Sequence, residues 1–523
     1  MNTLDDPPAQ HKLHTFLVLL CVSVPSFMIN LDSNIVAVSL PSIARSLHAD
    51  FADIEWVISA YMLTFASLVM TAGALADRYG RKRMLLVGLA VFMLASLICG
   101  MAPSAAALNG ARAVQGIGAA MQLSAALATL SHTFRGPERA RAFAFWGSVI
   151  GIAVSLGPVA GGFITQLFGW QWAFYINVPV GAIMIALTVY AVEESKDPNA
   201  LRIDYLGFLS FSAFLFLTTL ALISGNRDGW SNPRILSEFA AAIMLLAAFI
   251  VVETRQSRPM LDLRFFRIPT YIGANIAGVV YAASLLTMLT FVPVFLQRGL
   301  GHGPQEAGLL MLPMAVPLFV VPRLVASHLT YRISGRALIS MGLLLITVGL
   351  AWMATEIPRF NYLSLLGGML VAGCGAGILN GEIAKVGMTV IPPERAGMAS
   401  GVSGTARFSG IVVGFAALGA VLFARISATV AGAFPHTQSG DQHDFIRRIA
   451  AGDLTGTIGR SGQASLHALA VQSFANGYQT MMYSAALLSG IAGILSWLLV
   501  RYADTKPLAR VDQPEVAVAV LME

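Results

Sequence analysis

Gly73-Ala-Leu-Ala-Asp77-Arg78-Tyr-Gly80-Arg81-Lys82-Arg83 is the stretch that decides how the rest of this chain is interpreted. It closes one long apolar segment with small residues, adds an acid and a glycine suited to a tight turn, and supplies cations before the next apolar segment begins. Short charged connections between long apolar segments are typical of polytopic membrane proteins. The stretch therefore predicts a loop at a membrane surface.

The composition also indicates a membrane protein. Of 523 residues, 56% are hydrophobic and 11% charged, against about 25% charged in an average soluble domain, and the mean hydropathy is +0.72. The net charge of +6 comes from cations scattered over short segments, without a basic stripe or tail, so nucleic-acid binding is not expected. Cys21, Cys99 and Cys374 fall inside apolar segments, where we expect them to pack as small residues.

Fourteen segments are long and apolar enough to cross a bilayer, which takes roughly 20 helical residues. They lie near residues 15–38, 54–76, 84–102, 106–130, 140–165, 172–192, 205–224, 236–252, 270–296, 306–328, 336–354, 363–389, 398–424 and 479–501. The first lacks a small-residue cleavage site, so we expect a retained helix and not a signal peptide. The weakest segment is 236–252, and twelve helices are the alternative if 205–252 lies on the membrane surface.

The distribution of cations predicts the orientation. With the amino terminus in the cytoplasm, cytoplasmic segments carry more than twice as many Lys and Arg as external ones. The positive-inside rule then places both termini in the cytoplasm, and we expect a multi-pass protein of the cell's inner (plasma) membrane. The polar stretch 426–478 becomes a long, mostly irregular external loop with a short helix near 443–451 as an option, and 506–523 becomes a cytoplasmic tail.

A weak internal repeat divides the chain. Tyr331-Arg332-Ile-Ser-Gly335-Arg336 follows the second helix of the carboxy-terminal half, where residues 77–82 stand in the first half. The sequence thus predicts an amino-terminal six-helix bundle (1–200), an inserted helix pair (201–259) and a carboxy-terminal six-helix bundle (260–505). Carriers built from parallel repeats place their substrate site between such halves near the bilayer midplane.

The loop at residues 73–83 resembles the signature loop between the second and third helices of the major facilitator superfamily. Residues 112–118 resemble the fourth-helix motif of the same superfamily, and residues 157–162 resemble its antiporter motif. Further stretches resemble motifs of its fourteen-helix drug:H⁺ antiporter branch, at residues 31–41, 170–181, 203–207, 258–266 and 392–401. The resemblance covers most of the chain. It implies an all-α integral membrane fold of two six-helix bundles plus two inserted helices, and proton-coupled efflux of small amphipathic compounds or drugs by alternating access.

Asp32 and Arg112 are the residues expected to couple protons. An ionisable side chain inside a span costs at least ~2.5–3.5 kcal/mol, so it requires a partner or a water-filled cavity. Burial disfavours a charged carboxyl and a nearby cation favours it, so a carboxyl between these effects can take up and release a proton. A guanidinium keeps its charge and can act as the fixed cation. The alternatives are a satisfied polar residue near a helix end for Asp32 and a purely structural role for Arg112.

The charged loop is expected to act as a conformational latch formed by Gly73, Asp77, Arg78, Gly80, Arg81 and Lys82. We expect Asp77 to face a helix amino terminus and the cations to pair with acids on neighbouring loops. Such bonds would form in one state of the transporter and break in another. The alternative is that the cations only orient the loop.

The fifth span carries a run of small residues interrupted by a proline, namely Gly147, Gly151, Gly157, Pro158, Gly161 and Gly162. Small residues four apart let helices approach closely, and proline removes a backbone donor and bends the helix. Physical reasoning alone predicts tight packing here. Through the resemblance, the Gly-Pro-x-x-Gly-Gly arrangement marks antiporters as opposed to symporters.

One acid and one base depart from the resemblance. Glu382 and Lys385 lie three residues apart in the twelfth span, where members of the branch usually have apolar residues and a proline. Side chains three apart share a helix face, so the two can neutralise each other. The alternative is that one of them meets a charged substrate in a cavity. Arg407, in the next span, is a further candidate for an ion pair or a substrate contact.

We expect a small-molecule substrate, protons and the lipid bilayer as partners, without a cofactor, a metal or nucleic acid. A periplasmic adaptor is expected only if the host has two membranes. The sequence has no metal-spaced His/Glu cluster, no Gly-x-Ser-x-Gly and no phosphate loop, which argues against an enzyme. The alternative functions are a dedicated exporter of one metabolite or antibiotic and a non-transporting membrane sensor with the same fold.

Overall fold

Polar residues cap the beginnings of several helices. In the computed structural model, Asp50 caps α2 (Phe51–Tyr79) by accepting from the Asp53 amide (2.8 Å), and the Asp53 carboxylate accepts in turn from the Asp50 amide (3.3 Å). Ser104 caps α4 (Ala105–Thr133) by accepting from the Ala107 amide, and Ser334 caps α14 (Gly335–Glu356) by accepting from the Ala337 amide. The structure describes residues 8–134, 136–196, 205–256, 263–391, 396–433, 445–446, 448–450 and 463–507.

The described residues form helices in three groups. The amino-terminal half comprises α1 (Pro8–Leu47), α2, α3 (Arg81–Gly100), α4, α5 (Gly136–Phe168), the short α6 (Trp172–Tyr175) and α7 (Asn177–Ala191). The inserted pair is α8 (Tyr205–Asp228) and α9 (Pro233–Arg255). The carboxy-terminal half comprises α10 (Pro269–Tyr281), α11 (Thr287–Arg298), α12 (Pro304–Leu310), α13 (Leu312–Leu324), α14, α15 (Tyr362–Thr389), α16 (Ala396–Ala433) and α18 (Gln463–Leu499).

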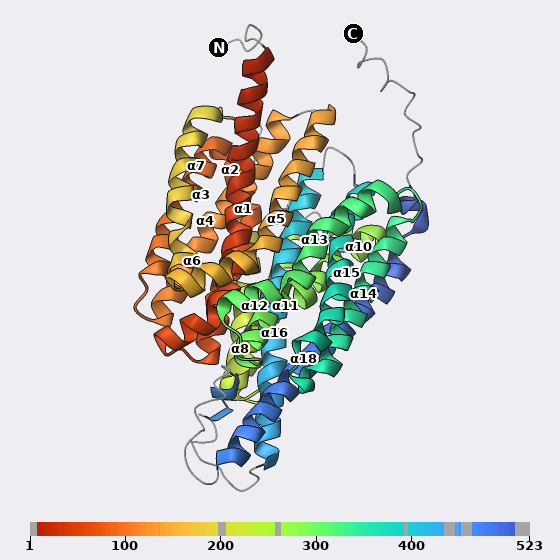
Figure 1. Cartoon of the computed structure of the whole chain (residues 1–523). Coiled ribbons are helices and arrows are strands. Elements are labelled where there is room, and N and C mark those ends of the chain that lie inside the picture. Colours follow the sequence, from red (N-terminus) through yellow and green to blue (C-terminus); the bar gives the residue numbers. More distant parts are fainter. Residues whose placement is uncertain are drawn as a thin grey trace, which may run out of the picture.

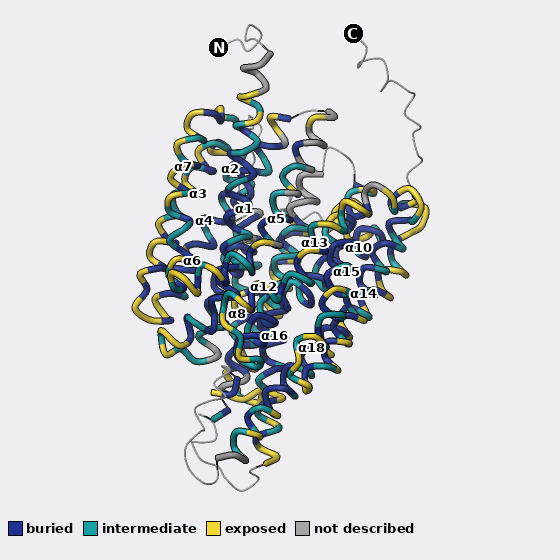
Figure 2. The backbone as a smooth tube through the Cα atoms, in the orientation of Figure 1, coloured by how far each residue is buried: buried dark blue, intermediate teal, exposed yellow. Residues whose placement is uncertain are grey.

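Eleven described helices are long and apolar enough to cross a membrane, and fourteen spans result when each of three bent pairs counts as one. The inserted pair is among them: Tyr205–Gly225 and Pro233–Arg255 both qualify. This agrees with the fourteen expected segments. The two halves stand side by side, with buried residues concentrated inside each bundle and along the seam between them (Figures 1 and 2).

Both described chain ends lie on the same side of the molecule, which we call the terminal face, and the opposite side is the distal face (Figure 1). Hydrogen bonds join the halves near the distal face. Gln297 of α11 donates from Nε2 to the Val38 carbonyl of α1 (2.7 Å), and Arg298 donates from Nη2 to the Pro41 carbonyl (2.8 Å). The structure is therefore closed on the distal side.

The inserted pair lies along the seam between the halves. Helix α8 packs against α9 and also against α2 and α16, one from each half. The ring centroids of Trp56 on α2 and Phe216 on α8 are 6.3 Å apart. The insert therefore covers the α2/α16 contact.

Helix α5 bends, as its proline predicts. The axis turns by 44° between residues 145–154 and 156–168. Pro158 has no amide proton for the carbonyl of residue 154, so the helical hydrogen bond that would oppose the bend is missing.

The glycines of α5 have different surroundings. A Cβ added at Gly161 would lie 2.8 Å from Cα of Ile35 on α1, and one at Gly162 would collide with the Pro304 carbonyl oxygen of α12. Gly157 likewise lies directly against Asn34 of α1. These three positions are the tight contacts that the sequence predicts. Gly147, by contrast, has no described atom within 4 Å of such a Cβ, and Gly151 has only an ordinary contact at 3.9 Å. Close packing is therefore confined to the distal part of α5.

The stretch 426–478 is less irregular than expected. Helix α16 continues to Ala433, α18 begins at Gln463, and residues 445–446 and 448–450 are helical. Ala-rich sequence favours helix even where hydropathy falls, and the two extensions pack against each other, with Ile426, Val430 and Phe474 buried. Both project beyond the distal ends of the other helices (Figure 1). The motif residues 203–204, 258–262 and 392–395, and the tail from residue 508, lie outside the described residues.

Adding a methyl group to two glycines of α5, Gly161 and Gly147, should distinguish its tightly packed positions from its open ones. We expect Gly161→Ala to lower the free energy of unfolding by about 1–3 kcal/mol, because its Cβ must displace the backbone of α1. Gly147→Ala should be neutral or raise it slightly, because alanine favours helix. Thermal unfolding of the detergent-purified variants measures both. Equal stability of the two variants would contradict the packing described for α5.

Candidate functional site

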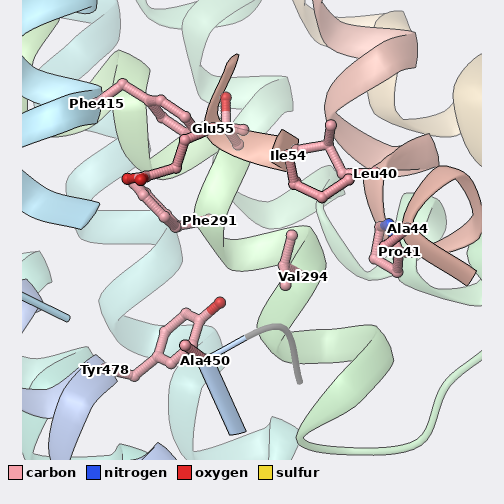
Figure 3. A pocket seen from close by; sticks show the side chains of 11 residues that line it. Leu40, Pro41, Ala44, Ile54, Glu55, Phe291, Val294, Phe415, Ala450 and Tyr478 are labelled. Carbon is pink, nitrogen blue, oxygen red and sulfur yellow. The ribbon is translucent and has the colours of Figure 1, made fainter. Parts of the chain in front are cut away.

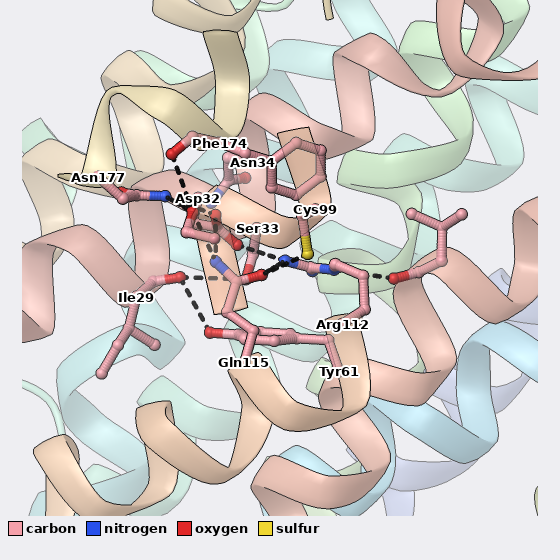
Figure 4. Close-up of polar contacts among 12 residues, drawn as sticks. Ile29, Asp32, Ser33, Asn34, Tyr61, Cys99, Arg112, Gln115, Phe174 and Asn177 are labelled. Atoms are coloured by element: carbon pink, nitrogen blue, oxygen red, sulfur yellow. Dashed lines mark hydrogen bonds and ion pairs between the residues drawn. The ribbon is translucent and has the colours of Figure 1, made fainter. Parts of the chain in front are cut away.

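A buried polar cluster occupies the centre of the amino-terminal half (Figure 4). Asp32 from α1 and Arg112 from α4 form an ion pair, with Nη1 2.6 Å from Oδ2 and both side chains 0% exposed. The other carboxylate oxygen, Oδ1, accepts from Gln115 Nε2 (3.0 Å) and from Asn177 Nδ2 (2.9 Å). Three N–H donors from two helices thus converge on one carboxylate.

The helices place these groups through short sequence features. Arg112 and Gln115 are three apart and so lie on the same face of α4, where Gln115 Oε1 also accepts from Arg112 Nη1 (2.7 Å). Asn177 is the first residue of α7, directly after the break that separates it from α6. Ser96 of α3 accepts from both amides, at 3.2 and 3.0 Å. The cluster thereby ties together four helices.

Helix α2 completes the surroundings of the guanidinium. Arg112 Nε donates to the Val57 carbonyl (3.0 Å), and the guanidinium lies 4.0 Å from the centre of the Tyr61 ring. This approach requires Gly116, because a Cβ there would collide with the Tyr61 carbonyl oxygen. Arg112 Nη2 is buried and has no hydrogen-bond partner among the described residues. The cation is thus held by one carboxylate, neutral acceptors and an aromatic face, with one donor unused.

Charge-assisted hydrogen bonds of this kind stabilise the ionised carboxylate. The sequence predicts Asp32 and Arg112 as the charged residues of the site, and the structure brings them into contact. The sequence does not predict the roles of Ser96, Tyr61, Gln115 and Asn177. Gln115 could have been found from its spacing to Arg112, whereas Asn177 and Ser96 reach the site only through tertiary packing.

The charged loop docks onto residues that follow α7. Gly80 has φ +119°, a conformation that side chains rarely adopt, and a Cβ there would also collide with the Glu194 carboxylate. The two Glu194 oxygens accept from the Lys82 and Arg83 amides, both at 3.2 Å. Glu194 therefore caps the amino terminus of α3.

Asp77 pairs with Arg81, the first residue of α3, with Nη2 2.8 Å from Oδ1. The carboxylate that accepts from the amides at the start of α3 is Glu194. Pairing with a neighbouring acid does occur, since Arg83 Nε lies 3.6 Å from Glu194. Gly73 has only an ordinary contact with Ser124. In sequence, an acid after a helix cannot be distinguished from an ordinary solvated surface residue. The sequence therefore does not predict the capping role of Glu194.

Glu382 and Lys385 pair with each other, as their spacing predicts. Lys385 Nζ lies 3.1 Å from Glu382 Oε1 and 3.3 Å from Oε2. The carboxylate is 4% exposed and lies against Gly335 of α14, inside the carboxy-terminal half, whereas the lysine side chain is 40% exposed. Arg407 lies elsewhere, 5.5 Å from the centre of the Tyr281 ring, and forms no ion pair with this acid among the described residues. The structure thus joins only two of the three candidates.

Two helical halves with eleven to fourteen candidate membrane spans, and a buried ion pair inside one half, are features of membrane carriers. The family model described as Major Facilitator Superfamily matches residues 22–415. The chain belongs to this superfamily, which is a family of transport proteins and not of enzymes. The expected fold class is confirmed.

The chain is also similar to named relatives and to a solved structure. The chain is 38% identical over 436 residues to the multidrug resistance protein Stp of Mycobacterium tuberculosis, covering 83% of this chain and 80% of Stp. It is 34% identical to the methylenomycin A resistance protein of Streptomyces coelicolor, covering 76% and 83%. A bacterial homologue of the human lysosomal transporter Spinster shares the fold at 15% identity, with a TM-score of 0.66 over 94% of this chain and 98% of that one.

The Glu194 cap should stabilise the start of α3. We expect Glu194→Ala to cost about 1 kcal/mol and to speed hydrogen exchange at the amides of residues 82 and 83, because it removes their shared acceptor. Glu193→Ala, which changes the exposed acid beside it, is the control and should leave exchange unchanged. Unaltered exchange in both variants would show that the cap does not hold the loop.

The two members of the Glu382–Lys385 pair should respond unequally to substitution. Lys385→Met leaves a buried carboxylate without its cation and should cost about 1–3 kcal/mol. Glu382→Gln leaves a lysine that already reaches solvent and should cost less. The double variant should recover the loss of Lys385→Met. Thermal unfolding of all four proteins tests this cycle, and a double variant less stable than Lys385→Met would contradict self-pairing.

Proposed function

We propose that this protein is a proton-coupled antiporter that exports small amphipathic compounds, including drugs, by alternating access between its two halves. The observation that carries the proposal is the fully buried Asp32–Arg112 pair. Several curated relatives are named for multidrug or antibiotic resistance or for efflux, which supports the substrate class.

Asp32 supplies the proton site. While ionised, it neutralises Arg112 and holds α1 against α4. A proton bound to Asp32 removes that charge, and the guanidinium, which cannot titrate, then requires another acceptor. Water supplies that acceptor when the halves move and the site hydrates, and Nη2, which has no partner among the described residues, can then donate to it. Proton binding and conformational change are therefore linked through the same contact.

The orientation follows from the distribution of cations. With both termini in the cytoplasm of an inner (plasma) membrane protein, the terminal face is cytoplasmic and the distal face is external. The hydrogen bonds between α1 and α11 then close the external side. This conformation is the one that faces inward in the transport cycle.

A dedicated exporter of a single antibiotic is the second candidate. The methylenomycin A resistance protein and the cephamycin export protein of Amycolatopsis lactamdurans, 33% identical over 409 residues, favour it by their names. Counterflow in proteoliposomes with cationic, neutral and anionic compounds under a pH gradient distinguishes a drug exporter of broad specificity from a dedicated exporter. Transport of compounds of one structure only would favour the dedicated exporter.

Substitution of the proton site gives the direct test. Asp32→Asn should abolish export driven by a pH gradient, because the amide cannot carry a proton through the cycle. The variant should lose stability, because Arg112 keeps only neutral acceptors, but it should remain in the membrane, since the amide oxygen of Asn can still accept from Arg112. Flux in proteoliposomes with an imposed gradient is the measurement, with Glu306→Gln, an exposed acid on α12, as the control. Full gradient-driven export by Asp32→Asn would refute proton coupling at this residue.

A further inference from the structure

Glu55 is a buried carboxyl that the Asp32 cluster does not use. It lies near the start of α2, close to the distal face, and is 2% exposed. Its Oε1 is shielded from solvent and has no hydrogen-bond partner among the described residues. Burying an unpaired carboxylate is far more costly than burying a neutral carboxyl. In this conformation the group therefore requires either a proton or a counterion.

The surroundings of Glu55 come from both halves of the protein (Figure 3). Its Oε1 fills the space that a side chain on Gly419 of α16 would occupy. Beside it, Phe415 of α16 stacks on Phe291 of α11, with ring centroids 4.7 Å apart. Leu40 of α1 lines the same small cavity. The carboxyl thus lies where the halves meet, in mostly apolar surroundings.

No counterion for Glu55 is found among the described groups that face it. Residues 448–450 also pack here: Ala450 lines the cavity, and the Arg448 side chain is exposed. The neighbouring ionisable group at the start of α2 is its cap Asp50, another acid, which disfavours a second negative charge. From α18, Tyr478 lines the far side of the cavity. From α11, Arg298 donates to the Pro41 carbonyl at the cavity edge and forms no ion pair with Glu55 among the described residues. The other residues that α1 and α16 contribute to the lining are apolar.

We infer that Glu55 is a proton-binding site at the distal contact between the halves. It holds a proton while α2 packs on α16, and it releases the proton when the halves separate and water reaches the carboxyl. Because closure binds a proton, acidification on the distal side favours the closed conformation. The inference rests on alternating access, and it uses a different residue and a different helix pair from the coupling proposed for Asp32.

The population of the distal-closed conformation tests the inference. Nitroxide labels at Ser46 and Thr355, exposed positions at the distal ends of the two halves, report the distance across the seam by electron–electron double resonance in lipid nanodiscs. The half-exposed Cys374 is replaced by serine, and the two buried cysteines remain. All measurements are made in the parent and in Asp32→Asn, so that the response of Glu55 is seen without Asp32.

In the Asp32→Asn background, the ratio of closed to open molecules should rise by up to about tenfold for each unit of pH lowered, as one bound proton requires. Glu55→Gln should be predominantly closed and insensitive to pH, because its amide mimics the protonated group. Glu55→Asp should keep a pH response, which shows that the carboxyl and not the local packing is responsible. Glu306→Gln, an exposed distal acid, should behave as the parent.

In the Asp32→Asn background, a pH response that persists when Glu55→Gln is added would overturn the inference, and so would a closed population that does not change with pH while Glu55 is intact. Either result can occur while Asp32→Asn still fails to couple export to the gradient, so the two proposals fail independently. If Glu55→Gln unfolds, Glu55→Asp provides the test instead. A Glu55→Asp variant whose halves still close, but whose closed population does not change with pH, would also overturn the inference.

Discussion

Arg112 cannot give up its charge, and this constraint organises the amino-terminal half. A guanidinium inside a bilayer requires a counterion and an acceptor or aromatic face for the rest of its surface. Helix α1 supplies the counterion as Asp32, and α2 supplies a carbonyl and the Tyr61 ring. Gln115 and Asn177 then satisfy the second carboxylate oxygen. The relative positions of these helices are set by one buried cation.

Nine residues of α1, from Asp32 to Leu40, connect this cluster to the seam between the halves. Asp32 binds Arg112, and Ile35, one turn later, packs on Gly161 of α5. The Val38 carbonyl then accepts from Gln297 in the other half, and Leu40 lines the cavity beside Glu55. A displacement of α1 that follows a change of charge at Asp32 therefore acts on the contacts that close the distal side. Small residues help to transmit such a displacement, because they let the helix backbones touch and the helices then move as packed units.

Most of the fold could be predicted from the sequence, because hydropathy and the length of a span are properties of each segment by itself. The same holds for Asp32 and Arg112, since a charge in a span is conspicuous. The partners of these residues could not be predicted: Ser96 and Tyr61 are ordinary in their own helices and gain a role only through packing. Glu194 was missed because exposed acids are common, and Glu55 because it stands at a helix end, where an acid usually meets water. The extensions of α16 and α18 could not be predicted from hydropathy, because both helices continue beyond the ends of their apolar segments.

The central claim is that Asp32 exchanges a proton in a site where Arg112 is the fixed cation. Infrared difference spectroscopy of the protein in lipid, between acidic and alkaline pH, observes the carboxyl group directly. The account predicts a protonated-carboxyl band that is lost at alkaline pH and replaced by carboxylate absorption, and that is missing from Asp32→Asn at every pH while the band of Glu55 remains. Identical difference spectra for the parent and Asp32→Asn would contradict the account, because Asp32 would then not titrate at all.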